Sequence, residues 1–160
     1  MSPAYTPLAS EAGYRQAFDT ILALAEREML IFDRDLTALR LEERPRLEAL
    51  AGFLQADRLR RIRVALHDPG PVERNAPRLM QLIARFSHVI EVRQSPENLR
   101  QLADTHALVD ARHAVRRFHV DQPRSALILD DWSYIHPWQQ RFEELWDLSH
   151  PCLRINTTGL

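Results

Sequence analysis

The chain has 160 residues, of which 45% are hydrophobic and 27% are charged, and this composition excludes a disordered or fibrous protein and is typical of a globular domain. A formal net charge of −1 provides no overall positive field, so nucleic acid is disfavoured as a partner, and binding through local arginine clusters is left as a weaker alternative. No apolar run reaches the roughly 18 residues of a membrane span, and the first residues do not resemble a secretory signal, so we expect a cytoplasmic protein.

The basic residues are unusual in kind. All 21 are arginine, and the chain contains no lysine. Because arginine cannot act as a titratable amine, Schiff-base enzymes, ordinary phosphate-binding loops and lysine-dependent phosphodiesterases are disfavoured. Cys152 is the single cysteine, which excludes an internal disulfide. The histidines show no metal-ligand spacing, so we expect neither a metal site nor a cofactor.

Hydrophobic periodicity predicts alternating helices and strands after a flexible, proline-rich arm over residues 1–9. Ser10 is placed to cap the first helix, and Pro45 to start the second. In chain order the predicted elements are a helix at 11–28, a strand at 29–33, a helix at 45–55, a strand at 61–68, a turn at 69–71, a helix at 76–86, a strand at 89–93, a short helix at 96–102, strands at 106–110, 113–118 and 125–130, and a helix at 132–149. This alternation predicts one α/β domain over residues 10–160, with a sheet covered by helices.

The stretch MLIFDRDLT (29–37) resembles the first motif of the haloacid dehalogenase superfamily, an apolar strand followed by D-x-D-x-T. That resemblance implies a magnesium-dependent phosphohydrolase in which Asp33 is the nucleophile, Asp35 is an acid/base, and Asp130 supplies the later acidic motif. Carboxylates at the end of a strand suit both roles, because α/β proteins bind ligands at that edge and magnesium prefers oxygen ligands. The helical segment before this strand and the short gap to the next strand depart from the family pattern.

The order and spacing of the elements over residues 28–149 resemble one half of the phospholipase D superfamily. RIRVALHDP (61–69) is similar to its arginine-rich strand, LADTHALVDARHAVRRF (102–118) to its signature hairpin, and WQQRFEELWDLS (138–149) to its closing helix. The resemblance implies an α/β half-domain with a mixed β-sheet flanked by helices. More narrowly, the chain resembles a small bacterial family of phospholipase D-like proteins of unknown function.

The signature H-x-K-x-x-x-x-D of that superfamily is absent from the hairpin. If Asp110 takes the place of the motif aspartate, the lysine position holds Thr105 and the histidine position holds Ala103. Threonine cannot supply a cation to a phosphodiester, and alanine cannot be a nucleophile. An aspartate at a hairpin turn that bonds its own backbone is enough to explain Asp110. We therefore expect no catalytic residues and a degenerate active site.

These observations favour a non-catalytic binding or regulatory module whose ligand is an unknown protein or an anion. The residues expected to bind such a ligand are Arg78, Asp110, Arg112, Arg116 and Arg117. Tryptophans 132, 138 and 146 belong either to the core or to a binding face, and the pattern leaves both open.

Self-association as a homodimer is also expected. Phospholipase D-like half-domains pair across their signature hairpins, and the apolar residues Leu108, Val109, Ala114 and Val115 need a cover if they lie at that face. Arginines 112, 116 and 117 oppose such pairing, because they would repel their symmetry mates unless carboxylates of the partner neutralised them.

Overall fold

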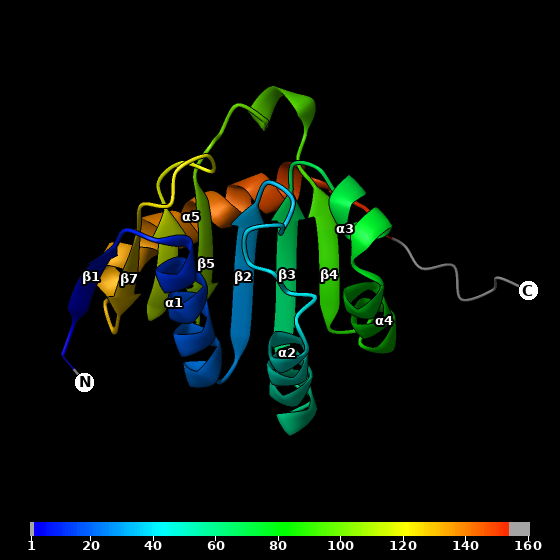
Figure 1. Ribbon diagram of the computed structural model, residues 1–160, viewed down its shortest axis with the longest axis horizontal. Helices are drawn as coiled ribbons and strands as arrows, with labels where there is room; N and C mark the ends of the chain where they lie inside the picture. The colour runs from blue at the N-terminus through cyan, green and yellow to red at the C-terminus, as the bar shows by residue number, and fades with distance from the viewer. Residues whose placement is uncertain (1, 154–160) are drawn as a thin grey trace, which may run out of the picture.

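The strands place alternate side chains on the two faces of one sheet, and different helices cover each face (Figure 1). The computed structural model describes residues 2–153. The strands are β1 (Ala4–Leu8), β2 (Glu28–Asp33), β3 (Arg61–Leu66), β4 (Ile90–Gln94), β5 (Thr105–Val109), β6 (His113–Arg117), β7 (Ser125–Leu129) and β8 (His150–Pro151). Within the described residues they form an eight-stranded sheet in the order β1-β7-β6-β5-β2-β3-β4-β8. β2, β3 and β4 are parallel and the other neighbours are antiparallel, so the predicted mixed sheet is confirmed.

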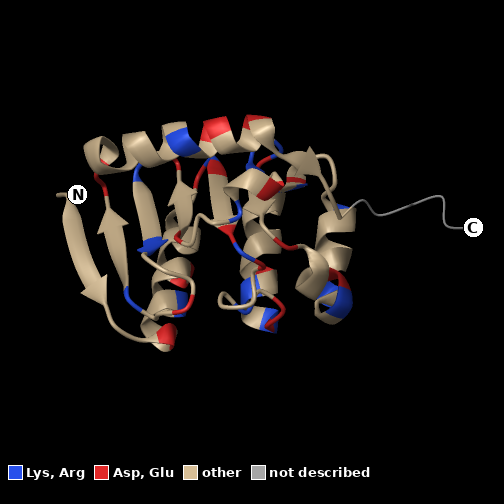
Figure 2. Ribbon diagram, turned by 90° about the horizontal axis from the view of Figure 1, so that it is seen from above, with Lys and Arg blue, Asp and Glu red and all other residues tan. Residues whose placement is uncertain are grey.

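The helices form two layers with the sheet between them, as Figure 2 shows from above. The helices are α1 (Glu11–Leu24), α2 (Arg44–Ala56), α3 (Gly70–Asn75), α4 (Pro77–Arg85) and α5 (Trp132–Leu148), with a 3-10 turn, η1 (Glu97–Leu99), between β4 and β5. Helices α1 to α4 share one core with the side of β2 that carries Ile31, whereas α5 covers the side that carries Phe32. The buried runs that predicted β2 and β3 thus have helices on both sides. None of the described helices has the length and hydropathy to span a membrane.

Local sequence explains where the two longest helices of the first layer begin. The Ser10 hydroxyl accepts a hydrogen bond from the backbone N–H of Gly13 at 2.9 Å, so the predicted N-cap is confirmed. Helix α2 begins with Pro45 in its first turn, where the missing N–H of proline has no intrahelical role.

Three predictions at the level of elements were wrong. Residues 4–8 of the predicted flexible arm form β1, which pairs with β7 along its whole length. The Pro69-Gly70-Pro71 turn is instead the start of α3, because a proline fits the first turn of a helix as well as it fits a β-turn. The short helix expected at 96–102 is reduced to the single 3-10 turn of η1. Residues 154–160 of the predicted domain lie outside the described residues.

Helix α5 is fixed to the sheet by arginines that stack on aromatic rings. Arg63 of β3 lies over the rings of Phe142 and Trp146, and both of its terminal nitrogens donate to Glu143, at 2.9 and 2.6 Å. Arg93 of β4 lies 4.2 Å from the Trp146 ring centre and donates to the carbonyl of the same residue. A flat guanidinium can stack and donate at once, whereas a lysine ammonium cannot. Trp146 therefore belongs to the core, whereas Trp132 at the start of α5 is 58% exposed.

Candidate functional site

The carboxyl ends of β2, β3 and β4 meet the start of β5 and the end of β6 at one edge of the sheet, hereafter the upper edge, because their arrows point upward in Figure 1. This is the edge at which open α/β sheets bind ligands. The polar side chains buried there are Asp33, His67, Ser95, Thr105, His106, Arg116, Arg117 and Ser125. The cross-strand pairs Thr105–Arg117 and His106–Arg116 divide this set, because one pair points to the α1 side and the other to the α5 side.

On the α1 side, Thr105 is 2% exposed and its hydroxyl lies 3.2 Å from the Tyr14 hydroxyl. Arg117 donates from its two terminal nitrogens to the two carboxylate oxygens of Glu11, at 2.6 and 2.7 Å. Burial raises the pKa of Tyr14, so its phenol is neutral. The position of the signature lysine is thus occupied by the buried hydroxyl of Thr105. This hydroxyl contacts Tyr14, and the neighbouring cation of Arg117 is paired with Glu11.

Asp33 ends β2 on the same side and is buried. One of its carboxylate oxygens accepts a hydrogen bond from the backbone N–H of Leu36 at 2.8 Å. Burial, with a smaller contribution from the charge of Asp35, raises the pKa of Asp33 to about 6, and nearby Arg117 opposes this rise. Asp33 is therefore a carboxyl that changes charge close to neutral pH.

On the α5 side, the ring of His67 is fixed at both nitrogens. Its Nδ1 contacts the Ser95 hydroxyl and its Nε2 lies 2.8 Å from the carbonyl oxygen of Leu102. Because a carbonyl can only accept, Nε2 carries the proton and Nδ1 accepts from the serine. Burial lowers the pKa of His67, so this neutral tautomer ties β3 to the segment that follows η1.

His106 is the least satisfied polar group at the upper edge. It is 1% exposed, and neither ring nitrogen has a hydrogen-bond partner. Its ring lies among those of Phe32, Trp138 and Phe142, with centroid distances of 5.4, 6.4 and 6.2 Å. Burial, with Arg141 adding to it, lowers the pKa of His106 to about 3. The ring is neutral throughout the physiological range.

Two arginines close the space beside His106. The guanidinium of Arg116 lies 3.5 Å from the Trp138 ring centre and donates to the Tyr134 hydroxyl at 3.0 Å. Arg141 donates to both carboxylate oxygens of Asp104, at 2.9 and 2.8 Å. The α5 side of the upper edge is consequently packed with internal stacking and ion-pair contacts.

Asp110 lies at the opposite edge of the sheet, where the hairpin turns. Its carboxylate accepts hydrogen bonds from the backbone N–H groups of Glu26, Arg27 and Glu28, at 2.8, 2.9 and 2.9 Å. These three donors belong to the connection that enters β2. Asp110 therefore joins the hairpin to the start of the central strand, and the bonds are not to its own turn as the sequence suggested.

The three carboxylates of the haloacid dehalogenase interpretation do not converge. Asp33 and Asp35 lie at the upper edge, whereas Asp130 follows β7 at the opposite edge, where Arg112 donates to it at 2.8 Å. Among residues 2–153 no group of three or more His, Cys, Asp or Glu side chains could hold a metal ion. The residues present do not fit a magnesium site, because its ligands would have to come from opposite ends of the strands.

The residues predicted to bind an anion are also not brought together. Arg116 and Arg117 share the upper edge on opposite faces, and Asp110 and Arg112 occupy the other edge. Arg78 belongs to neither group of strand ends, since it lies in the first turn of α4, where its backbone N–H donates to Glu42 at 3.0 Å. Neither His67 nor His106 was predicted as a site residue. One signal was available for His67, because it directly follows β3 just as Asp33 ends the parallel neighbour β2.

A family model named DUF7931, a domain of unknown function, matches residues 10–157. The chain belongs to this family. No curated protein matches the DUF7931 chain. Among solved structures it is similar to Nuc from Salmonella typhimurium, a phospholipase D family member, with a TM-score of 0.65, 12% identity and coverage of 94% of this chain and 99% of that one. NucT from Helicobacter pylori gives a TM-score of 0.62 at 10% identity, over 94% of this chain and 100% of that one.

A third structure, the archaeal chromatin protein TrmBL2, described as showing a novel mode of DNA binding, gives a TM-score of 0.67 at 14% identity. The match covers 92% of the DUF7931 chain and 54% of TrmBL2, so this chain corresponds to about half of that protein. These likenesses establish the fold. The phospholipase D-like fold expected from the sequence is confirmed.

Proposed function

We propose that this DUF7931 domain is a non-catalytic phospholipase D-like binding or regulatory module that acts in the cytoplasm. The observation that carries the proposal is the state of the lysine position, Thr105, whose buried hydroxyl contacts Tyr14. Beside it, the cation of Arg117 is neutralised by Glu11 and has no free face for a phosphate. The remaining position, Ala103, has no side chain that could attack phosphorus.

The two buried histidines of the upper edge, His67 and His106, do not replace the missing groups. His67 has both ring nitrogens engaged, and His106 is enclosed by aromatic rings. A nucleophile must be within reach of the bond it attacks. Neither ring meets that condition in this structure.

The purified protein is expected to release no p-nitrophenolate from bis(p-nitrophenyl) phosphate above the rate of a protein-free sample. The reason is that the upper edge has no lysine cation and that its buried imidazoles, His67 and His106, are not within reach of a phosphodiester. Release is measured by absorbance, with and without added divalent metal. Turnover that persists through purification and is lost in folded His67→Ala, His106→Ala or His119→Ala would contradict the proposal, since these imidazoles lie at this edge, the first two buried and the third exposed after β6.

The class of ligand includes nucleic acid. The net charge of −1 argued against it, but a protein described as DNA-binding shares the fold, and this weighs against excluding DNA. A net charge near zero does not prevent local arginine clusters from contacting phosphates.

Homodimerisation stays part of the proposal, but the four apolar hairpin residues that suggested it do not need a partner. Leu108, Val109, Ala114 and Val115 are buried within their own chain, between α1 on one side and α5 on the other. Helices of the same chain therefore bury the residues that a partner was expected to cover. Support comes from the resemblance to phospholipase D-like half-domains, which pair, and from the match of this chain over 99% of Nuc and 100% of NucT. Light scattering at tens of micromolar is expected to give twice the 18.6 kDa chain mass, and a monomer mass in both low and high salt would end the idea.

A further inference from the structure

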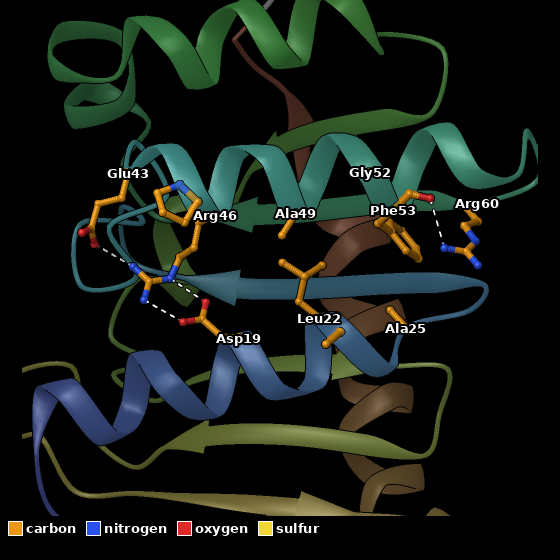
Figure 3. A pocket seen from close by; sticks show the side chains of 11 residues that line it. Asp19, Leu22, Ala25, Glu43, Arg46, Ala49, Gly52, Phe53 and Arg60 are labelled. Atoms are coloured by element: carbon orange, nitrogen blue, oxygen red, sulfur yellow. Dashed lines mark hydrogen bonds and ion pairs between the residues drawn. The ribbon is translucent and has the colours of Figure 1, made fainter.

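An open groove of about 500 Å³ runs between α1 and α2, on the face of the sheet opposite α5 (Figure 3). Its floor is apolar: Leu22 of α1 and Ala49 and Phe53 of α2 point into it. Charged side chains stand at its two ends, and they differ in how far they are neutralised. The groove is separate from the upper edge, so a ligand bound in it is independent of the proposed loss of catalysis.

One end of the groove is fully paired. Arg46 donates to both carboxylate oxygens of Asp19, at 2.7 and 2.9 Å, and to Glu43 at 2.7 Å. Two carboxylates therefore surround a single guanidinium, and this end has no positive charge to offer.

The other end carries Arg60, which is held in place without a carboxylate. Its Nη1 donates to the carbonyl of Phe53 at 3.2 Å, and its guanidinium lies 5.0 Å from the centre of the Phe53 ring. Its Nε is buried with no hydrogen-bond partner. No described carboxylate lies within ion-pair distance of it, in contrast to Arg46, Arg63, Arg117 and Arg141. An anion is the partner this positioned cation lacks.

Gly52 points to an occupant in the same place. It lies inside α2 and lines the groove, and a β-carbon added there would meet nothing within 4 Å. Its φ is not in the left-handed region. Because glycine inside a helix is less stable than alanine, and neither φ nor packing requires it here, the fold alone does not explain the residue. A ligand that lies against the α2 backbone does.

We propose that the groove binds a small organic carboxylate with an apolar body. The body lies along Leu22, Ala49 and Phe53, closest to the backbone at Gly52, and the carboxylate meets Arg60. The volume is in the range of small-molecule sites, which are mostly apolar with few polar groups. The charge difference between the two ends sets the orientation, because the carboxylates of Asp19 and Glu43 repel an anionic head from the paired end.

The test is calorimetric titration of the whole chain with octanoate, with 1-octanol as the uncharged probe. Octanoate is expected to bind at least about tenfold more tightly than octanol, because a charge-assisted pair forms at Arg60. Arg60→Gln should remove that preference. The matched control Arg58→Gln makes the same charge change at an exposed arginine outside the groove and should leave binding unchanged.

Gly52→Leu tests the location, since leucine favours helix and its side chain enters open space. This variant should keep the circular dichroism and unfolding midpoint of the parent while losing octanoate binding. Three results would overturn the proposal: no octanoate binding by the parent at millimolar concentration, undiminished binding in Gly52→Leu, or equal losses in Arg60→Gln and Arg58→Gln. The last would mean diffuse attraction to arginine rather than a site.

Discussion

Replacing Asp110 with alanine is expected to lower the free energy of unfolding by about 3–5 kcal/mol, measured by urea denaturation at neutral pH. The carboxylate accepts three backbone hydrogen bonds from residues 26–28, and hydrogen bonds to a charged acceptor are stronger than neutral ones. The backbone N–H of Asp110 also donates to the Glu28 carbonyl at 3.2 Å, which positions the carboxylate over its donors. Alanine removes the acceptor and leaves three donors at the entrance to β2.

Two variants separate this effect from the general loss of an acid. Asp121→Ala removes an exposed carboxylate that pairs with exposed Arg34, and it should change stability by no more than about 0.5 kcal/mol. Asp110→Asn keeps one acceptor oxygen and should fall between alanine and the parent. If Asp110→Ala and Asp121→Ala have similar unfolding midpoints, the three bonds do not contribute as the geometry implies.

Asp110 also shows how much could be predicted from the sequence. Its place at the end of a strand in a hairpin was predicted, and its lack of a catalytic role stays a prediction. Its partners were not predicted, because they lie 82 to 84 residues away in the chain. Turn chemistry describes local partners, and only the antiparallel pairing of β5 with β2 brings these donors to the hairpin.

The same distinction between local patterns and contacts distant in the chain holds for the helices and strands. β2, β3 and α5 were predicted closely because burial on one or both faces leaves a hydrophobic pattern in the sequence. β1 was missed because its residues are almost all exposed and it is held by backbone pairing to β7, which leaves no such pattern. Pro7 made the segment look even less like a strand, yet proline is tolerated in an edge strand.

The candidate site was predictable only in part. Asp33 was recognised as a carboxylate at the end of a strand, but the burial that raises its pKa depends on tertiary packing, which leaves no local pattern in the sequence. His106 gave no signal at all, since nothing in the sequence around it indicates that its ring would be enclosed by residues of β2 and α5.

Asp33 and His106 are expected to change the free energy of unfolding with pH in opposite directions. The folded-state pKa of His106 is about 3, below its usual 6.5, so the unfolded chain gains a proton that the folded chain does not. Its contribution to stability is present above pH 6.5 and is lost as the pH falls toward 3, at up to about 1.4 kcal/mol per pH unit. The folded-state pKa of Asp33 is about 6, above its usual 3.8, so its contribution is present below 3.8 and is lost as the pH rises to 6.

The two slopes overlap between about pH 4 and 6 and cancel there in the parent protein, so single variants are needed to reveal them. Urea unfolding at pH 7.5 and 4.5 is the measurement. His106→Leu removes two unpartnered nitrogens at similar volume. When the pH is lowered from 7.5 to 4.5, the free energy of unfolding of this variant should rise by about 2–3 kcal/mol relative to that of the parent. Over the same change in pH, the free energy of unfolding of Asp33→Asn should fall by a comparable amount relative to that of the parent.

Because each variant is compared with the parent at both pH values, the contributions of the other titrating groups to the pH dependence cancel. These groups include His67 and His113, whose pKa values are also lowered by burial. The charges that face His106 are Asp104, Arg116 and Arg141, and those that face Asp33 are Asp35 and Arg117; all remain in both variants. A His106→Leu protein with the same pH dependence as the parent would show that the imidazole is protonated while folded. In that case α5 opens to water over His106, and the upper edge would be accessible after all.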